Sequence, residues 1–341
     1  MSTSDNGADP RAQVMDLITA AWSTQVIGVA VKLRLFEKLA EGPRAAAALA
    51  GETGSHPGAL HRLMRALAAL GLVSQDGEDL FVITPTGRLL VEGEPGSVRG
   101  TALHWGDRLW GALSQLDQSV KTGKAWRISG ASGFEHMADD PQQMAMFHQS
   151  MADLTAPVAG AVLKAYDFSP FSQIMDVGGS TGALLAAMLK AHPRLHGRVF
   201  DLPGLAPMAE AHLQAQGVGD RAAFVGGSFF EAVPPGAELI MMKMIIHDWL
   251  DEEASAILVN SRKALAPGGI VLVMDRVMPE LVTASPVDYA GARADITMLT
   301  AAGGKERTRA EFEALFTGAG LKLQRIVPTT SEFAILEASA A

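Results

Sequence analysis

One stretch near the middle of the chain constrains the fold more than any other. An apolar run that ends at Asp176 leads into a glycine-rich turn at 178–182 and then into an apolar pattern of helical spacing at 183–189. This order is typical of a β-strand, a tight turn and an α-helix. Glycines in such a turn permit positive φ angles, and the start of the following helix offers unpaired N–H groups. The stretch predicts a nucleotide-binding turn in an α/β domain, with an ordinary strand-to-helix turn as the alternative.

The residues of the turn favour one nucleotide cofactor over another. The dinucleotide fingerprint requires a glycine where Ser180 stands. A carboxylate at Asp176 would repel a pyrophosphate, whereas S-adenosylmethionine has no phosphate and carries an ammonium and a sulfonium group. The turn therefore favours S-adenosylmethionine over NAD, and a nicotinamide enzyme remains the competing interpretation.

Strands alternate with helices from residue 167 onward, which predicts a mainly parallel sheet with helices on both faces and an antiparallel last strand. Asp201 ends a short strand about 20 residues beyond the glycine turn, where an acid can reach ribose hydroxyls. An apolar strand interrupted by Lys243 delivers His247 at its carboxyl end, the place where open α/β sheets put their chemistry. We expect the catalytic domain to span 167–341.

The front of the chain predicts a separate domain. Apolar residues recur at helical spacing through 14–36 on more than one helix face, which indicates burial against a second copy and so a homodimer. The order of helix, helix and hairpin over 44–83 is that of a winged helix. We expect a dimerisation domain at 1–100 and linking helices that contribute to the substrate pocket at 101–166. A DNA-binding winged helix that uses Arg62 and Arg65 is the alternative.

Composition narrows the classes of function. The 341 residues suffice for two domains, and a net charge of −9 argues against a general nucleic-acid surface. The chain has no cysteine, which excludes disulfides and thiolate zinc sites, and no metal site is expected. Charged side chains interrupt the apolar helix at 26–39, so no membrane segment is expected. Residues 1–9 do not resemble a secretory signal, which predicts a cytoplasmic protein.

Ordered motifs along the chain resemble the caffeic acid and hydroxyindole O-methyltransferase family. They are Asp-Val-Gly-Gly-Ser-Thr-Gly at 176–182, Phe-Asp-Leu-Pro at 200–203, Lys-Met-Ile-Ile-His-Asp-Trp at 243–249, and Asp-Ile-Thr-Met-Leu at 295–299 before Gly-Gly-Lys-Glu-Arg-Thr at 303–308. The resemblance covers most of the chain. It implies a Rossmann-like class I methyltransferase domain with an N-terminal winged-helix dimerisation domain, and S-adenosylmethionine as the cofactor.

The resemblance also implies site residues. Gly178 would lie against the methionine part of the cofactor, Asp201 would hold the ribose hydroxyls, and Lys243 would border the adenine end. The implied cofactor positions are Asp176, Gly178, Gly182, Asp201, Ser228, Phe229, Lys243, Met151 and Thr155. The implied substrate positions are Phe147, Met151, Trp249, Asp295 and Met298. Methionine and aromatic side chains at helical spacing also suit a plain core, so Phe147 and Met151 have two interpretations.

The implied catalytic base is His247, flanked by Asp275 and Glu306. With those acids, the histidine would take a proton from a phenolic or polyketide-like hydroxyl, and the expected function is an S-adenosylmethionine-dependent O-methyltransferase of secondary metabolism. Ser180 and Ser228 depart from the family pattern, which predicts weaker cofactor binding. The alternatives are N-methylation, a non-methylating reaction and a winged-helix regulator. The alternative interpretation of His247 itself is a structural histidine at the sheet edge that hydrogen-bonds a neighbour.

Overall fold

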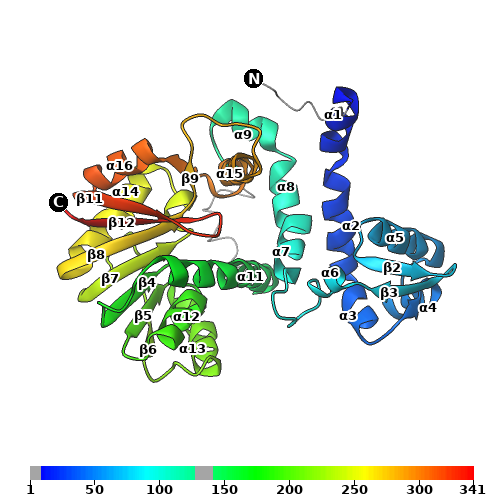
Figure 1. The fold of residues 1–341 in the computed structure, drawn as a ribbon, viewed down its shortest axis with the longest axis horizontal. Helices are drawn as coiled ribbons and strands as arrows, with labels where there is room; N and C mark the ends of the chain where they lie inside the picture. Colours follow the sequence, from blue (N-terminus) through cyan, green and yellow to red (C-terminus); the bar gives the residue numbers. More distant parts are fainter. Residues whose placement is uncertain (1–8, 127–140) are drawn as a thin grey trace. The chain divides into compact units, whose positions relative to one another are not determined.

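The computed structural model describes residues 9–126 and 141–341, with the backbone alone for 141–146. The chain divides into two compact units, Met1–Trp110 and Gly111–Ala341 (Figure 1). This boundary lies inside the segment 101–166, so the helical turns at the start of the predicted linking region belong to the first unit. The contribution of that region to a substrate pocket stays a prediction.

The first unit is mainly helical. Its helices are α1 Pro10–Thr19, α2 Ala21–Lys32, α3 Leu35–Ala40, α4 Ala46–Thr53, α5 Pro57–Ala69, α6 Pro85–Arg88, α7 Arg99–His104 and the π-helix η1 Trp105–Leu109. Its strands β1 Arg44–Ala45, β2 Val73–Asp76 and β3 Leu80–Ile83 form an antiparallel sheet in the order β1-β3-β2. The sequence of α4, α5 and the β2–β3 hairpin is the predicted winged-helix order.

Helices α1 and α2 expose a row of large apolar side chains. They are Val14, Met15, Leu17, Ile18, Trp22 and Val29. Within the described ranges, the stretch Pro10–Lys32 is the one helical segment long and apolar enough, by length and composition alone, to cross a membrane. The absence of a membrane segment therefore stays a prediction. An exposed apolar helix face is also what a surface for a second subunit requires.

The second unit is built on a sheet that has seven strands in the part of the chain that the structure describes. The order is β11-β12-β8-β7-β4-β5-β6, in which β8 to β6 are parallel and β12 runs antiparallel to β8 and β11 (Figure 1). The strands are β4 Gln173–Val177, β5 His196–Asp201, β6 Ala222–Gly226, β7 Ala237–Lys243, β8 Leu265–Asp275, β11 Leu321–Pro328 and β12 Ala334–Ala340. The predicted parallel sheet with an antiparallel last strand is confirmed.

Helices cover both faces of this sheet. The helices packed on it are α11 Pro141–Ala165, α12 Ala183–Ala191, α13 Ala206–Ala215, α14 Asp251–Ala264 and α16 Arg309–Gly318. The second unit also contains α9 Leu116–Thr122 and α15 Pro286–Thr297, and α8 Trp110–Leu113 begins at the boundary between the units. Alternate residues of β7 enter two separate cores, because successive side chains of a strand point to opposite faces. Leu239 and Met241 join the core beneath α11 and α12, whereas Ile240 and Met242 join the core beneath α14 and α16.

Two features of the topology bring distant residues to one place. The carboxyl ends of β4, β5, β7 and β8 meet at one edge of the sheet, since these strands are parallel. Beyond β8, the short strand β9 Val277–Met278 pairs in parallel with β10 Arg307–Thr308. This pairing carries the loop before β10 to the same edge, where Glu306 joins the residues that follow β7.

Candidate active site

The turn after β4 adopts a conformation that suits glycine. Gly178 and Gly182 have φ angles of +71° and +76°, in the left-handed region that favours residues without a Cβ. A Cβ on Gly178 would lie 2.3 Å from the Ile245 side chain, and one on Gly182 would lie 2.8 Å from Val199. The turn can therefore pack closely only with glycine at these two positions, as the sequence predicts for a nucleotide-binding turn.

Asp201 and Asp176 stand at the ends of the two neighbouring strands. The Asp201 carboxylate accepts N–H hydrogen bonds from Ser180 at 2.8 Å and from Leu202 at 2.7 Å. Asp176 is buried, and its Oδ2 atom has no hydrogen-bond partner among the described residues. Burial raises the pKa of Asp176 to about 7, although the nearby Lys243 ammonium opposes this rise. Two carboxyl groups at the strand ends suit a cationic ligand better than a phosphate.

Lys243 ends β7 among carboxyl groups. Burial lowers the pKa of Lys243, and the charges of Asp176, Asp275 and Asp248 partly offset this shift. Its Nζ atom lies 3.4 Å from the sulfur of Met244, whose φ angle of +57° marks the sharp turn out of the strand. The predicted neighbour of the cofactor therefore lies between the glycine turn and the residues around His247.

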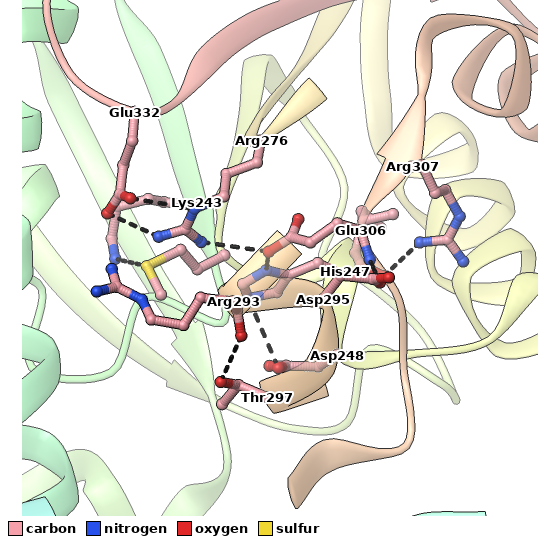
Figure 2. A network of polar contacts seen from close by, with 12 residues as sticks. Lys243, His247, Asp248, Arg276, Arg293, Asp295, Thr297, Glu306, Arg307 and Glu332 are labelled. Carbon is pink, nitrogen blue, oxygen red and sulfur yellow. Dashed lines mark hydrogen bonds and ion pairs between the residues drawn. The ribbon is translucent and has the colours of Figure 1, made fainter. Parts of the chain in front are cut away.

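His247 follows β7 in the short 3-10 helix η3 Ile246–Asp248 and is 2% exposed. Its Nδ1 lies 3.0 Å from Glu306 Oε1, and its Nε2 lies 3.6 Å from Asp248 Oδ1 (Figure 2). Burial by itself lowers the pKa of His247, but the charges of Asp275 and Asp248 and the hydrogen bond to Glu306 outweigh it and raise this pKa to about 9. The imidazole is thus a strong base held in one orientation.

Glu306 is held on several sides. Arg276 Nη1 lies 3.2 Å from the same Oε1 atom that His247 contacts, and Arg276 Nη2 lies 2.6 Å from Glu332 (Figure 2). Burial raises the pKa of Glu306, but the hydrogen bond and charge of His247 and the Arg276 guanidinium lower it below its usual value overall. Its backbone N–H donates to Asp295 Oδ1 at 2.9 Å. Glu306 is therefore a fixed carboxylate, and Asp295 supports its backbone.

The loop before Glu306 packs directly on the His247 backbone. The N–H group of Lys305 donates to the carbonyl oxygen of His247 at 2.9 Å. A Cβ on Gly304 would lie 2.0 Å from that same oxygen and 2.3 Å from the carbonyl carbon of Asp248. This position therefore needs a glycine to let the two backbones meet.

Arg307 fastens the same loop to the segment after His247. Its buried guanidinium donates to the carbonyl oxygens of Ile246 at 3.0 Å and Trp249 at 2.8 Å, and to the Asp251 carboxylate. A buried arginine whose guanidinium makes this many hydrogen bonds holds two segments of the chain firmly together. The distance between His247 and Glu306 is thus set by backbone contacts on both sides of the pair.

Asp275, the second predicted flanking acid, is 0% exposed at the end of β8. Neither of its carboxyl oxygens has a hydrogen-bond partner among the described residues. Burial raises the pKa of Asp275 to about 7, with His247 as the main opposing charge. Of the two predicted acids, Glu306 therefore makes the contact with the imidazole, and Asp275 acts on it through charge. Asp248, the residue after His247, lies close to Nε2.

The remaining predicted site residues fall into two groups. On α11, the hydroxyl of Thr155 donates to the carbonyl oxygen of Met151 at 2.6 Å, while Phe147 lies one helical turn before Met151. Near η3, the ring of Trp249 packs against those of Phe229 and Phe230, with centroids 6.0 Å and 4.7 Å away.

Two further predicted positions belong to local structure. The hydroxyl of Ser228 accepts the Phe230 N–H at 3.3 Å within its own turn. Met298 begins the π-helix η4 Met298–Ala302, and π-helical turns are frequent at functional sites.

Sequence reasoning missed three side chains that contact residues of the candidate site: Arg276, Arg307, and His148, whose Nδ1 lies 2.7 Å from the Ser180 hydroxyl. Arg276 directly follows Asp275 at the end of β8, so the rule that places chemistry at strand ends could have found it. Arg307 and His148 have no comparable signal. Their partners are distant in the chain, and only the folded arrangement brings them together.

This combination of parallel sheet, glycine turn and acid-paired histidine defines the class of Rossmann-like methyltransferases. The chain belongs to the O-methyltransferase family, because the model of the O-methyltransferase domain matches residues 113–322. The model of the O-methyltransferase dimerisation domain matches residues 15–93, so the first unit contains such a domain. The protein is an S-adenosylmethionine-dependent O-methyltransferase.

Similar proteins span nearly the whole chain. A phenazine O-methyltransferase of Lysobacter antibioticus is 36% identical over 97% of this chain and 97% of its own length. A mitomycin biosynthesis 6-O-methyltransferase of Streptomyces lavendulae is 36% identical over 92% of this chain and 90% of its own. An 8-amino-8-demethylriboflavin N,N-dimethyltransferase of Streptomyces davaonensis is 32% identical over 92% of this chain and 90% of its own. The relatives are biosynthetic enzymes of secondary metabolism.

Solved structures agree with this assignment. The crystal structure of LaPhzM has a TM-score of 0.94 at 35% identity and covers 98% of this chain and 100% of its own. The structure of NcsB1, from neocarzinostatin biosynthesis, with S-adenosyl-L-homocysteine and 1,4-dihydroxy-2-naphthoic acid has a TM-score of 0.82 at 33% identity, over 98% of this chain and 99% of its own. The cofactor of this protein is thus S-adenosylmethionine.

Proposed function

We propose that the protein methylates a hydroxyl group on an aromatic or polyketide-like small molecule, with His247 as the general base. The observation that carries this proposal is the buried contact of 3.0 Å between His247 Nδ1 and Glu306 Oε1. It fixes the ring so that Nε2 is the nitrogen left to act on an acceptor. A histidine oriented by a carboxylate is the usual arrangement for taking a proton from a hydroxyl.

The residues at the strand ends fit the cofactor. Asp176 Oδ2 is a buried acceptor without a partner in the described residues, and Asp201 offers a second carboxylate beside it. These charges suit the ammonium and sulfonium groups of S-adenosylmethionine. When bound, this cofactor supplies a methyl group on a sulfonium that departs as a neutral thioether.

Each cofactor contact that the resemblance implies belongs to this proposal. Asp201 would hold the ribose hydroxyls, Gly178 would lie against the methionine part, and Lys243 would border the adenine. The other proposed cofactor contacts are Asp176, Gly182, Ser228, Phe229, Met151 and Thr155.

Removal of the proton from the acceptor hydroxyl is the step that the side chains of this protein would control. A phenol with a pKa near 10 needs roughly 4 kcal/mol to ionise at pH 7. His247, whose pKa is about 9, comes within about one unit of that value. Proton transfer between the two groups is therefore nearly balanced. A hydrogen bond from Nδ1–H to the Glu306 carboxylate stabilises the imidazolium once Nε2 has taken the proton.

Two further carboxylates near His247, besides Glu306, affect its imidazolium form. Asp275 stabilises the imidazolium through charge from a site where it makes no hydrogen bond with the described residues. Asp248 lies 3.6 Å from Nε2, so an entering hydroxyl would approach the nitrogen beside it. The proposed roles are general base for His247, orientation for Glu306 and electrostatic support for Asp275.

Aromatic acceptors are the best supported class. The names of several relatives point to planar hydroxylated rings, such as 2,7-dihydroxy-5-methyl-1-naphthoate and 3-amino-4-hydroxybenzoate. Phe147 and Met151 on α11 would form a wall for such a ring. The other proposed substrate contacts are Trp249, Asp295 and Met298.

The homodimer expected from the sequence is also part of this proposal, supported by the dimerisation domain and by the exposed apolar face of α1 and α2. The cytoplasmic location stays a prediction.

The test compares wild type with His247→Ala against a panel of phenols and aromatic amines. We expect methylation of phenols by wild type and a loss of about 10²- to 10⁴-fold in kcat for the variant. Affinity for S-adenosylhomocysteine, measured by calorimetry, should be unchanged in the variant, which shows that the fold and cofactor site survive. Transfer to amines alone would favour N-methylation, the activity in the name of the riboflavin-type relative. Full activity of the His247→Ala variant would refute the proposed role of His247 as general base.

A further inference from the structure

Ser180 has an unusual conformation for a residue with a side chain. Its φ angle is +53°, in the left-handed region, where a Cβ makes the backbone strained. A glycine would adopt the same conformation freely, and a glycine is common at this position in the family that the turn resembles. The presence of serine therefore requires something that offsets the strain.

Two hydrogen bonds use this serine. Its hydroxyl lies 2.7 Å from Nδ1 of His148, and its backbone N–H donates to Oδ2 of Asp201 at 2.8 Å. His148 lies on α11 and is 6% exposed, while Asp201 ends β5. Ser180 thus connects a helix and a strand end across the glycine turn.

The protonation of His148 suits this contact. Burial lowers the pKa of His148, so its ring is neutral near pH 7. A neutral imidazole can accept a hydrogen bond at Nδ1 from the hydroxyl of Ser180, and the observed distance is normal for such a bond.

The position of His148 on α11 gives the contact a second consequence. The neighbouring Phe147 ring meets the His148 ring edge-on at a centroid distance of 5.6 Å. Met151 lies on the same helix, less than one turn after His148. The helix face proposed to contact cofactor and acceptor is therefore anchored to the turn that would hold the cofactor.

We propose that His148 and Ser180 are a positioning pair for the cofactor site. Their hydrogen bond holds Ser180 in the left-handed conformation, so that its N–H fixes the Asp201 carboxylate, and it keeps α11 in register with the glycine turn. This inference rests on the proposed contact between Asp201 and the cofactor ribose. It also revises the expectation from the sequence: Ser180 need not weaken binding, because His148 compensates for it.

The test is calorimetric titration of the full-length protein with S-adenosylhomocysteine. We expect His148→Ala and Ser180→Ala each to weaken binding by about five- to tenfold, the effect of losing one hydrogen bond of ordinary strength. The double variant should bind no more weakly than either single one, because the two changes remove the same interaction. Gln149→Ala, an exposed neighbour of His148 on α11, is the matched control and should bind like wild type.

A second series separates positioning from direct contact with the cofactor. Glycine at position 180 relieves the strained φ, so His148→Ala/Ser180→Gly should bind more tightly than His148→Ala/Ser180→Ala. His148→Gln keeps a hydrogen-bonding atom and should bind within about twofold of wild type, which also guards against misfolding of the alanine variant.

The outcomes divide cleanly between the two proposals. Single variants with wild-type affinity, or losses that multiply in the double variant, would overturn the pair while leaving the proposed function intact. Wild-type protein that does not bind S-adenosylhomocysteine would instead overturn the proposed cofactor contacts on which the pair depends.

Discussion

Arg276 and His247 share a single oxygen atom of Glu306. Arg276 Nη1 lies 3.2 Å and His247 Nδ1 lies 3.0 Å from Oε1, and the Arg276 guanidinium also stacks over Phe333 at 4.4 Å from the ring centroid. A cation beside the carboxylate reduces the charge that the imidazole feels. Arg276 therefore limits how strongly Glu306 raises the pKa of His247, and it does so from the strand end next to Asp275.

Replacing Arg276 with methionine should make His247 harder to deprotonate. Without the guanidinium, the Glu306 carboxylate attracts the imidazolium proton more strongly, so the pKa of His247 rises further. We expect kcat/KM at pH 7 to fall by about three- to tenfold, which corresponds to half to one pKa unit. Arg325→Met removes another Arg–Glu pair, with Glu337, and is the control. A fall of the same size in both variants would contradict this role for Arg276.

The pH dependence of the wild-type enzyme follows from the raised pKa of His247. The base form of the imidazole is scarce at pH 7 and increases as the pH approaches 9. With one acceptor throughout, kcat/KM should rise steeply from pH 6.5 and level off only above pH 9, where more than half of the imidazole is in the base form. A profile that is flat over this range would argue against His247 as the base.

Glu306→Gln tests the same histidine from its partner's side. Glutamine removes the negative charge at Oε1, so the pKa of His247 falls and the rising limb of the pH profile moves to lower pH. The imidazolium also loses its stabilising partner, and we expect the maximal kcat to drop by about 10²-fold. Binding of S-adenosylhomocysteine should stay at the wild-type value. An unchanged limb would show that Glu306 does not set the basicity of His247.

Gly304→Ala should disable the enzyme without removing any charged group. The added methyl group would lie 2.0 Å from the carbonyl oxygen of His247, so the loop that carries Glu306 must move away. We expect a loss of about 10²-fold or more in kcat, the effect of misplacing a catalytic group by about 1 Å. Gly318→Ala is the control, because nothing lies within 4 Å of its added Cβ and its helix tolerates alanine. Equal activity of the two variants would contradict the need for close backbone contact.

Oligomeric state can be tested on the exposed face of α1. Ile18 is 66% exposed there, and in a homodimer it would be covered by the second copy. We expect wild type to sediment as a dimer and Ile18→Lys to shift towards monomer, since a buried lysine without a partner destabilises an interface. Val120→Lys, at a residue 65% exposed on α9, is the matched control and should remain dimeric. Wild type that sediments as a monomer would refute the proposed dimer.

Several elements were predictable because their signals are local. The alternation of strands and helices after residue 167, the antiparallel last strand and the helix-helix-hairpin order at the front all appear in the structure as expected. The ordered motifs sufficed to identify the family, because each of them is a short run of neighbouring residues, and those at 176–182, 200–203 and 243–249 each mark a strand end and the turn after it.

The sequence by itself therefore determined the class of fold, the cofactor and the identity of the acid-paired histidine. Only the tertiary structure decided which acid contacts His247, because Glu306 is 59 residues away in the chain. The pairing of β9 with β10 and the hydrogen bonds of Arg307 bring the two residues together. Only the tertiary structure likewise brought the hydroxyl of Ser180 within hydrogen-bond distance of His148, 32 residues away in the chain. Periodicity and motifs report what each segment forms with its neighbours, whereas side-chain hydrogen bonds between distant segments depend on how those segments pack.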